Sequence, residues 1–146
     1  MHIHELGHVV LFVSDLERSA NFYRDTLGFH ELQRLRGASV FRGCRTHHEL
    51  LLIEVGGAPH DRQHPEPGLY HIGFKIGDTH EDLVDAYHEL EAKGVTIVGT
   101  ADHTVTHSLY ILDPDGNELE LYADVSDIWK MNPHAILSPT MPLPIR

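Results

Sequence analysis

The sequence predicts an α+β fold in which two tandem βαβββ modules form a cupped mixed β-sheet with helices on the outside. Three observations predict it: an internal repeat, helix signals after each copy of the repeat, and strand-like segments after each helix. The repeat sets "HVVLFVSD", beginning at His8, beside "HIGFKIGD", beginning at His71. Each copy is a histidine, five mainly apolar residues, a small residue and an aspartate. Such self-similarity indicates a duplicated structural unit.

Each copy of the repeat leads into a helical pattern with a start and a stop. Ser14 and Glu17 have the spacing of a capping box, and Gly28 can end that first helix. Thr79 can cap the second helix, and Gly94 can end it. The apolar stripes expected to be buried are Leu16, Ala20, Tyr23 and Leu27 in the first helix, and Leu83, Ala86, Tyr87 and Leu90 in the second.

Strand-like segments complete both modules, which we expect to form a single domain over residues 1–146. Module one spans about 4–56, a polar Gly/Pro-rich linker spans 57–68, and module two spans about 69–125. The tail spans 126–146. The prolines of its last part, "SPTMPLPIR" at 138–146, disfavour a regular helix, so we expect that part to lie extended over the body or over a neighbouring chain. The predicted strands after the helices are 39–43, 49–55, 96–100, 108–113 and 118–122, with the last two joined by a turn at 113–116.

Composition restricts the possible partners. The formal net charge is −11, which disfavours nucleic acid and anionic membrane surfaces and favours a small-molecule partner. Cys44 is the one cysteine, so no internal disulfide can form, and the first residues contain no apolar segment of signal-peptide or membrane-span length. We therefore expect a cytoplasmic protein. The 14 histidines are many, but a metal site uses only two to four of them, so spacing must identify which.

Alternation along the strands of module two sorts side chains onto a helix-covered face and an open face. His71 on the first strand and Glu120 on the last both fall on the open face, so they can look into one cavity. The helix-facing residues are Ile72, Phe74, Ile76, Leu119 and Leu121, and the open-face residues are His71, Gly73, Lys75, Glu118, Glu120 and Tyr122.

His8, His71 and Glu120 are therefore candidate metal ligands. Two imidazoles and one carboxylate on rigid strands, with other coordination positions open, suit a non-haem Fe(II) centre. The two histidines occupy equivalent positions of the repeat, which favours a shared role. The alternative is that both are strand histidines bonded to backbone and that Glu120 is a solvated side chain.

Three segments carry a family resemblance: "GHVVLFVSDLERSANFYRDTLGF", "YHIGFKIGD" and "DPDGNELELY". Over residues 4 to about 125 the chain resembles the vicinal oxygen chelate superfamily, which includes glyoxalase I, fosfomycin-resistance enzymes, bleomycin-binding proteins and extradiol dioxygenases. The resemblance implies metal ligands at His8, His71 and Glu120. It also implies a divalent metal, with Fe(II) expected first and Mn(II), Zn(II) or Ni(II) as alternatives, and a homodimer.

The stretch "ADHTVTHSLYILDPDGNELELY" is similar to extradiol dioxygenases, and most similar to small single-domain type I members. This implies that His103 is an acid/base beside a catechol-like substrate and dioxygen, and that Tyr110 hydrogen-bonds a substrate hydroxyl. The activity implied is ring cleavage in aromatic catabolism. The structural alternatives are a loop histidine for His103, a half-buried strand aromatic for Tyr110, and a structural or outer-shell role for His107.

Two other functions stay open. Glu54 occupies in module one the strand that Glu120 occupies in module two. This layout resembles that of glyoxalase I, which has a fourth metal ligand at the corresponding place. A protein that binds a small molecule or antibiotic without chemistry is the third possibility. Well-known extradiol enzymes of this type are commonly two-domain chains about twice as long, so this chain corresponds to one such domain. His47 and His48 are expected to be surface residues at a strand end.

Overall fold

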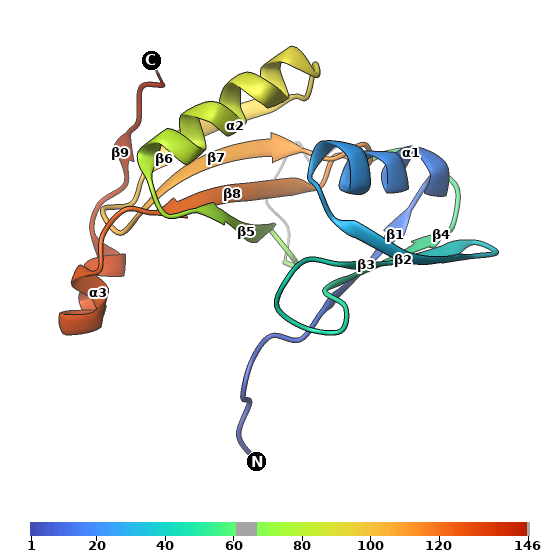
Figure 1. Cartoon of the computed structure of the whole chain (residues 1–146), viewed down its shortest axis with the longest axis horizontal. Coiled ribbons are helices and arrows are strands. Elements are labelled where there is room, and N and C mark those ends of the chain that lie inside the picture. Colours follow the sequence, from blue (N-terminus) through green and yellow to red (C-terminus); the bar gives the residue numbers. More distant parts are fainter. Residues whose placement is uncertain (61–66, 146) are drawn as a thin grey trace. The chain divides into compact units, whose positions relative to one another are not determined.

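The computed structural model describes residues 1–60 and 67–145, which form two compact units (Figure 1). The first unit takes the described residues up to 60 together with Pro114–Gly116, and the second takes the described residues from 67 onward without those three. Each unit is a mixed sheet with helices, which confirms the predicted α+β class. The predicted linker, 57–68, lies partly outside the described residues. Within the described ranges, no helix is both long and apolar enough to cross a membrane.

The first unit contains a mixed sheet in the order β1-β4-β3-β2. β1 and β4 pair in parallel, and the other neighbours pair antiparallel. β2 is a strand that the sequence did not predict, because "HELQRL" lacks apolar alternation. It supplies the third strand after the helix that the βαβββ pattern requires. The elements are β1 (Val9–Val13), α1 (Leu16–Asn21) continued by a π-helical turn (Phe22–Thr26), β2 (His30–Leu35), β3 (Ala38–Arg42) and β4 (Leu50–Glu54).

Helix α1 begins one residue later than predicted. Asp15, not Ser14, is the N-cap, and its Oδ1 accepts a hydrogen bond of 2.9 Å from the backbone N–H of Arg18. Ser14 is engaged elsewhere, since its N–H and hydroxyl both donate to the buried carboxylate of Asp115. Glu17 pairs with Arg34 instead of closing a capping box. Of the predicted stripe, Leu16, Ala20 and Tyr23 are buried and Leu27 is half-buried, and Gly28 ends the helical segment at φ 78°.

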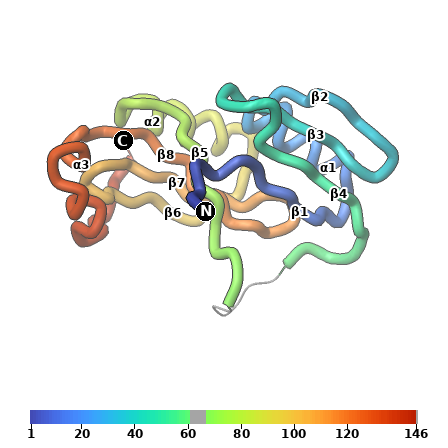
Figure 2. The backbone as a smooth tube through the Cα atoms, turned by 90° about the horizontal axis from the view of Figure 1, so that it is seen from below, coloured from blue at the N-terminus to red at the C-terminus, as the bar shows by residue number. Residues whose placement is uncertain are grey.

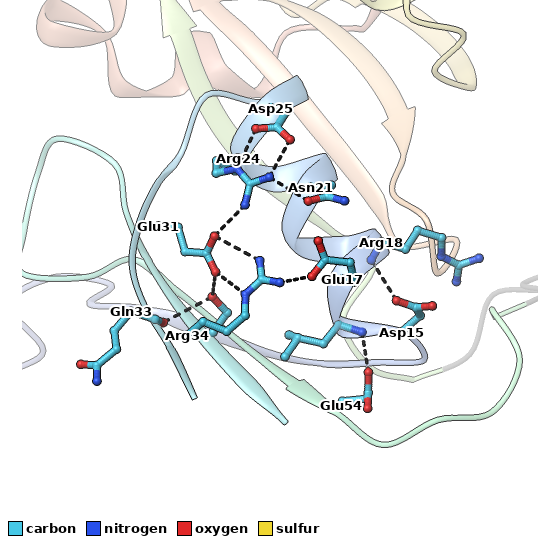
Figure 3. A network of polar contacts seen from close by, with 12 residues as sticks. Asp15, Glu17, Arg18, Asn21, Arg24, Asp25, Glu31, Gln33, Arg34 and Glu54 are labelled. Carbon is cyan, nitrogen blue, oxygen red and sulfur yellow. Dashed lines mark hydrogen bonds and ion pairs between the residues drawn. The ribbon is translucent and has the colours of Figure 1, made fainter. Parts of the chain in front are cut away.

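Glu31 is the centre of a polar network that attaches the edge strand β2 to its surroundings (Figure 3). Arg34 Nε lies 2.6 Å from its Oε1, and Arg24 Nη1 lies 2.8 Å from its Oε2. The Ser39 hydroxyl on β3 donates to the same carboxylate at 2.6 Å. The bonds from Arg34 above all, with those from Ser39 and Arg24, lower the pKa of Glu31 to about 2. The network therefore replaces the apolar contacts that β2 lacks.

Glu31→Gln is expected to lower the free energy of unfolding by about 1 kcal/mol at pH 7, because both arginines are partly solvated and their ion pairs are screened. The folded pKa of Glu31 lies below its unfolded value, so the carboxylate stabilises the fold above pH ~4.5 and loses this contribution as the pH falls toward 2. Urea unfolding at pH 7 and at pH 3 should show the gap between wild type and variant narrowing at the lower pH. Glu17→Gln, at a more exposed partner of Arg34, is the control. If the difference in free energy of unfolding between wild type and Glu31→Gln were as large at pH 3 as at pH 7, the destabilisation would come from packing and not from the charge.

The second unit contains a mixed sheet in the order β5-β8-β7-β6-β9. β5 and β8 are parallel, the other neighbours are antiparallel, and α2 lies across one face (Figures 1 and 2). The elements are β5 (His71–Gly77), α2 (His80–Ala92), β6 (Ile97–Asp102), β7 (Thr106–Leu112), β8 (Glu118–Asp124), α3 (Ile128–Met131), a 3-10 helix (Pro133–Leu137) and β9 (Met141–Pro142).

Helix α2 has the predicted ends. Thr79 and Asp82 form a reciprocal capping box at its start. Gly94 follows its last turn at φ 69°, where its N–H donates to the carbonyl of Glu91 and the next N–H, of Val95, donates to that of Leu90. This is a Schellman motif, which satisfies carbonyls that the helix end leaves open. The predicted stripe is only partly enclosed: Leu83 and Leu90 are buried, while Ala86 and Tyr87 are half-buried.

Alternation places the predicted residues on the two faces of the second sheet, with one exception. Leu119 and Leu121 on β8 are buried, and Ile72 on β5 is nearly so. Ile76 was predicted to face the helix but is 37% exposed. The pairing of β5 with β8 shifts register between Lys75 and Gly77, so Ile76 lies within the irregularity and leaves the alternation.

The tail turns back onto its own sheet. After α3 and the 3-10 helix, which the sequence did not predict, β9 pairs antiparallel with β6, with Asp102 opposite Met141. The Thr100 hydroxyl donates to the carbonyl of Leu143 at 2.6 Å. The last part of the tail is thus extended, as expected, and it covers the β6 edge of this chain.

Candidate functional site

A pocket of about 540 Å³ opens in the second unit and contains several of the predicted site residues. Most of its polar lining comes from β5, β7, β8 and the turn between β6 and β7. Much of its apolar lining comes from the tail. The lining residues are His71, His103, Val105, Thr106, Tyr110, Glu120, Tyr122, Asp124, Trp129, Pro133 and Ile136.

His71 and Glu120 meet at this pocket, as alternation predicted. They project from the parallel strands β5 and β8, where Gly73 is the partner of Glu120 in the register. His71 Nε2 lies 3.0 Å from Glu120 Oε2, and both side chains are about three-quarters or more buried.

Two hydroxyl groups on β7 hold the Glu120 carboxylate. Ser108 Oγ donates to Oε1 at 2.6 Å, and the Tyr110 hydroxyl donates to the same oxygen at 3.3 Å. Tyr110 is the register partner of Glu120 across the antiparallel pair. Burial, and then the charge of Glu120, raise the pKa of Tyr110 to about 12. Tyr110 therefore remains a hydrogen-bond donor at neutral pH. The role of Ser108 was not predicted, although Ser108 lies two residues before Tyr110 on β7 and therefore has the same strand parity.

His103 reaches the same group from the turn between β6 and β7. Its Nε2 lies 2.8 Å from the Tyr110 hydroxyl and 4.0 Å from Glu120 Oε1. The turn is tight: Thr104, a β-branched residue, has φ 72°, and its N–H donates to Asp102 Oδ1 at 2.6 Å. This backbone conformation costs roughly 1–3 kcal/mol. The surrounding hydrogen bonds therefore hold His103 in a defined position.

The His71–Glu120 pair fits two positions in the coordination sphere of a metal ion. Nitrogen and oxygen ligands about 2.1 Å from one ion, at a near-right angle, are themselves about 3 Å apart. His71 Nδ1 is buried and has no hydrogen-bond partner among the described residues, with Glu118 Oε1 at 3.7 Å. A metal on Nε2 requires the proton on Nδ1, where Glu118 can accept it, as carboxylates beside ligand histidines do.

His8 belongs to the first unit, so its contacts are those within that unit. It is exposed, precedes β1 directly, and has the strand parity of the exposed Val10 and Phe12. Its ring lies 4.7 Å from that of His48. Taking each unit by itself, the described residues contain no group of three His, Cys, Asp or Glu side chains arranged to bind a metal. His8 as the third ligand therefore stays a prediction.

Two other candidates have structural contacts that account for them. Glu54 Oε2 accepts a hydrogen bond of 2.7 Å from the backbone N–H of Leu16, at the start of α1 (Figure 3). His107 lies on the helix side of β7, where its Nδ1 is 2.9 Å from that of His80 and its Nε2 is 3.8 Å from Asp102. Burial lowers the pKa of His107. Neither residue lines the pocket.

Sequence reasoning missed several residues that contact or neighbour the site side chains. Ser108 and Glu118 could have been found from alternation, because both share a strand face with a predicted residue. Thr140 could not, because its contact with His103 depends on how the tail returns to β6. The structure also places Trp129, from the tail, in the pocket lining.

Comparison with known proteins places this geometry in a family. The family model described as "Glyoxalase/Bleomycin resistance protein/Dioxygenase superfamily" matches residues 5–121. A biphenyl-2,3-diol 1,2-dioxygenase of Rhodococcus globerulus is 33% identical over 82% of this chain, which spans 63% of that relative's length. A metallothiol transferase of Staphylococcus haemolyticus, FosB, is 31% identical over 80% of this chain and 81% of its own.

A solved structure supports the fold. The crystal structure of a glyoxalase/dioxygenase from Nostoc punctiforme has a TM-score of 0.68, covers 84% of this chain and 92% of its own, and is 21% identical. At that identity the likeness shows the fold alone. The two mixed sheets and the fold of the solved structure agree with the family match. Because the family model covers most of the chain, the chain belongs to the glyoxalase/bleomycin resistance protein/dioxygenase superfamily, also called the vicinal oxygen chelate superfamily.

Proposed function

We propose that this chain is a metal-dependent extradiol dioxygenase that cleaves the ring of a catechol-like substrate. His8, His71 and Glu120 would hold the metal, His103 would be the acid/base, and Tyr110 would hydrogen-bond a substrate hydroxyl. The observation that carries the proposal is the hydrogen-bonded chain from His103 through Tyr110 to Glu120, which lines one pocket together with His71. The relative named as a biphenyl-2,3-diol dioxygenase supports the choice of an aromatic diol.

A divalent ion, with Fe(II) our first choice, would lower the pKa values of two vicinal substrate hydroxyls and supply electrons to dioxygen. Fe(II) is favoured because two imidazoles and one carboxylate are its usual set in oxygenases. The chain's contribution to holding it is the burial of the His71–Glu120 pair and the two hydroxyl donors on Glu120.

His103 and Tyr110 have the positions that proton transfer and substrate orientation need. The imidazole of His103 can accept a proton from a substrate hydroxyl in the pocket and return it to the developing product. Tyr110 remains protonated, so it can donate a hydrogen bond to a substrate oxygen at neutral pH. The apolar residues Val105, Trp129 and Ile136 complete the pocket lining and suit the hydrocarbon part of an aromatic ring.

The glyoxalase-type alternative depends on Glu54 as a fourth ligand. The Glu54 carboxylate instead accepts a hydrogen bond from the first residue of α1. On β4 it shares the parity of Leu50 and Leu52, which are buried. Both observations favour a structural role for Glu54, and they support our choice of the dioxygenase.

Anaerobic purification, metal analysis and reconstitution with Fe(II), Mn(II), Zn(II) or Ni(II) test the proposal. Each form is then supplied with catechol and with 2,3-dihydroxybiphenyl. Oxygen uptake matched by a yellow ring-cleavage product in the Fe(II) form is the expected result. Tight aromatic binding without oxygen uptake in any metal form would instead identify a binding protein. Activity on a hemithioacetal in the Ni(II) or Zn(II) form would identify an isomerase.

A further inference from the structure

The candidate site continues past the residues that the family model matches. Trp129, Pro133 and Ile136 line the pocket, and Thr140 Oγ1 lies 3.2 Å from His103 Nδ1. All four lie beyond residue 121, where the family match ends. We propose that this carboxyl-terminal segment, residues 128–143, is a working part of the site, in which Thr140 is a positioning residue for His103. The role of His103 in turnover rests on the proposed function.

Contacts at both ring nitrogens fix the orientation of His103. Its Nε2 lies 2.8 Å from the Tyr110 hydroxyl, on the side of the pocket. Its Nδ1 lies 3.2 Å from Thr140 Oγ1. A rotation of the ring would break both contacts at once. Thr140 therefore keeps Nε2 directed toward the pocket and, as the partner of Nδ1, influences which nitrogen carries the proton.

The backbone holds Thr140 at this place. β9 pairs antiparallel with β6, with Ala101 opposite Pro142 and Asp102 opposite Met141. One more step in this register brings His103 opposite Thr140, so the contact follows from strand pairing. The bond from Thr100 Oγ1 to the Leu143 carbonyl, 2.6 Å, anchors the other side of β9.

The same segment gives the pocket part of its apolar lining. Trp129 from α3 and Pro133 and Ile136 from the 3-10 helix line the pocket that His103 and Tyr110 also line. Trp129 and Ile136 remain 45% and 65% exposed, so core packing alone does not account for their position. The segment therefore contributes apolar surface to the pocket and a polar contact to His103, which lines it.

Thr140→Val and Thr140→Ser test the proposal as a matched pair, because valine keeps the shape and loses the hydroxyl, whereas serine keeps the hydroxyl. Long-range ¹H–¹⁵N spectra of the metal-free, histidine-labelled protein report the tautomer of His103, whose signals are assigned by their loss in His103→Gln. Wild type and Thr140→Ser are expected to show the same His103 pattern with one tautomer dominant, and Thr140→Val a mixture of both tautomers. Ser138→Ala, a hydroxyl of the same segment that does not line the pocket, is the control.

Turnover of the Fe(II) form supplies the second readout. Thr140→Val is expected to lower kcat about 10-fold with little change in KM, and Thr140→Ser to restore most of it, since a misplaced acid/base loses rate rather than binding. Unchanged His103 signals in Thr140→Val, or a Thr140→Ser that behaves like Thr140→Val, would overturn the positioning role. If the spectra change as expected but no form cleaves a catechol, the proposed function is wrong and the positioning of His103 stands.

Discussion

Glu120→Gln is expected to lower metal affinity by more than about 100-fold, because outer-shell partners of metal ligands already contribute 10–100-fold and a direct anionic ligand contributes more. Gln keeps the size of the side chain and can still accept from Ser108 and Tyr110, whose bonds to Oε1 hold Glu120 now. The fold should therefore remain intact, with only a small change in Tm. Metal content after anaerobic reconstitution, with titration calorimetry, measures the loss.

Two other glutamate variants serve as comparisons for Glu120→Gln. Glu118→Gln removes the carboxylate 3.7 Å from His71 Nδ1, and about a 10-fold loss of metal affinity is expected because it would orient the ligand without touching the metal. Glu89→Gln changes an exposed residue on α2 and should have no effect. Near-stoichiometric metal in Glu120→Gln would remove Glu120 from the ligand set and would reduce its contact with His71 to an ordinary hydrogen bond.

His103→Gln is expected to lower kcat by about 10²–10⁴-fold while metal content stays unchanged, because general acid–base catalysis typically contributes that much. The amide retains hydrogen-bonding capacity toward Tyr110 but cannot carry a proton between substrate and product. Steady-state oxygen uptake in the Fe(II) form, with metal analysis of the same sample, separates loss of chemistry from loss of metal.

The control for this experiment is another histidine of the second unit. His88 on α2 is well exposed and lies outside the pocket, so His88→Gln should retain wild-type kcat. If His103→Gln lost no more activity than His88→Gln, the proton-transfer role of His103 would be wrong. A loss of metal in His103→Gln would instead point to a role in holding the metal site together.

Local signals in the sequence were enough for the main elements of the fold. The repeat at His8 and His71 predicted two modules, and capping residues such as Thr79 predicted helix ends, because helix starts and stops depend on neighbouring residues. Alternation predicted that His71 and Glu120 share a face, since side chains alternate regularly along a strand, and the family resemblance singled out Tyr110. The exceptions have tertiary causes. The Ser14 hydroxyl donates to Asp115, so Asp15 is the N-cap of α1 in its place. A register shift between β5 and β8 exposes Ile76.

The sequence by itself thus determined the α+β architecture and the shared face of His71 and Glu120, and its motifs indicated the family. Only the tertiary structure decided that β2 is a strand supported by ion pairs, that Glu54 is bonded to α1, and that the tail brings Thr140 to His103. The physical reason is the range of the interactions. Periodicity and capping are set by residues a few positions apart. The pairing of an edge strand, the hydrogen bond of Glu54 and the path of the tail depend on partners that only folding brings together.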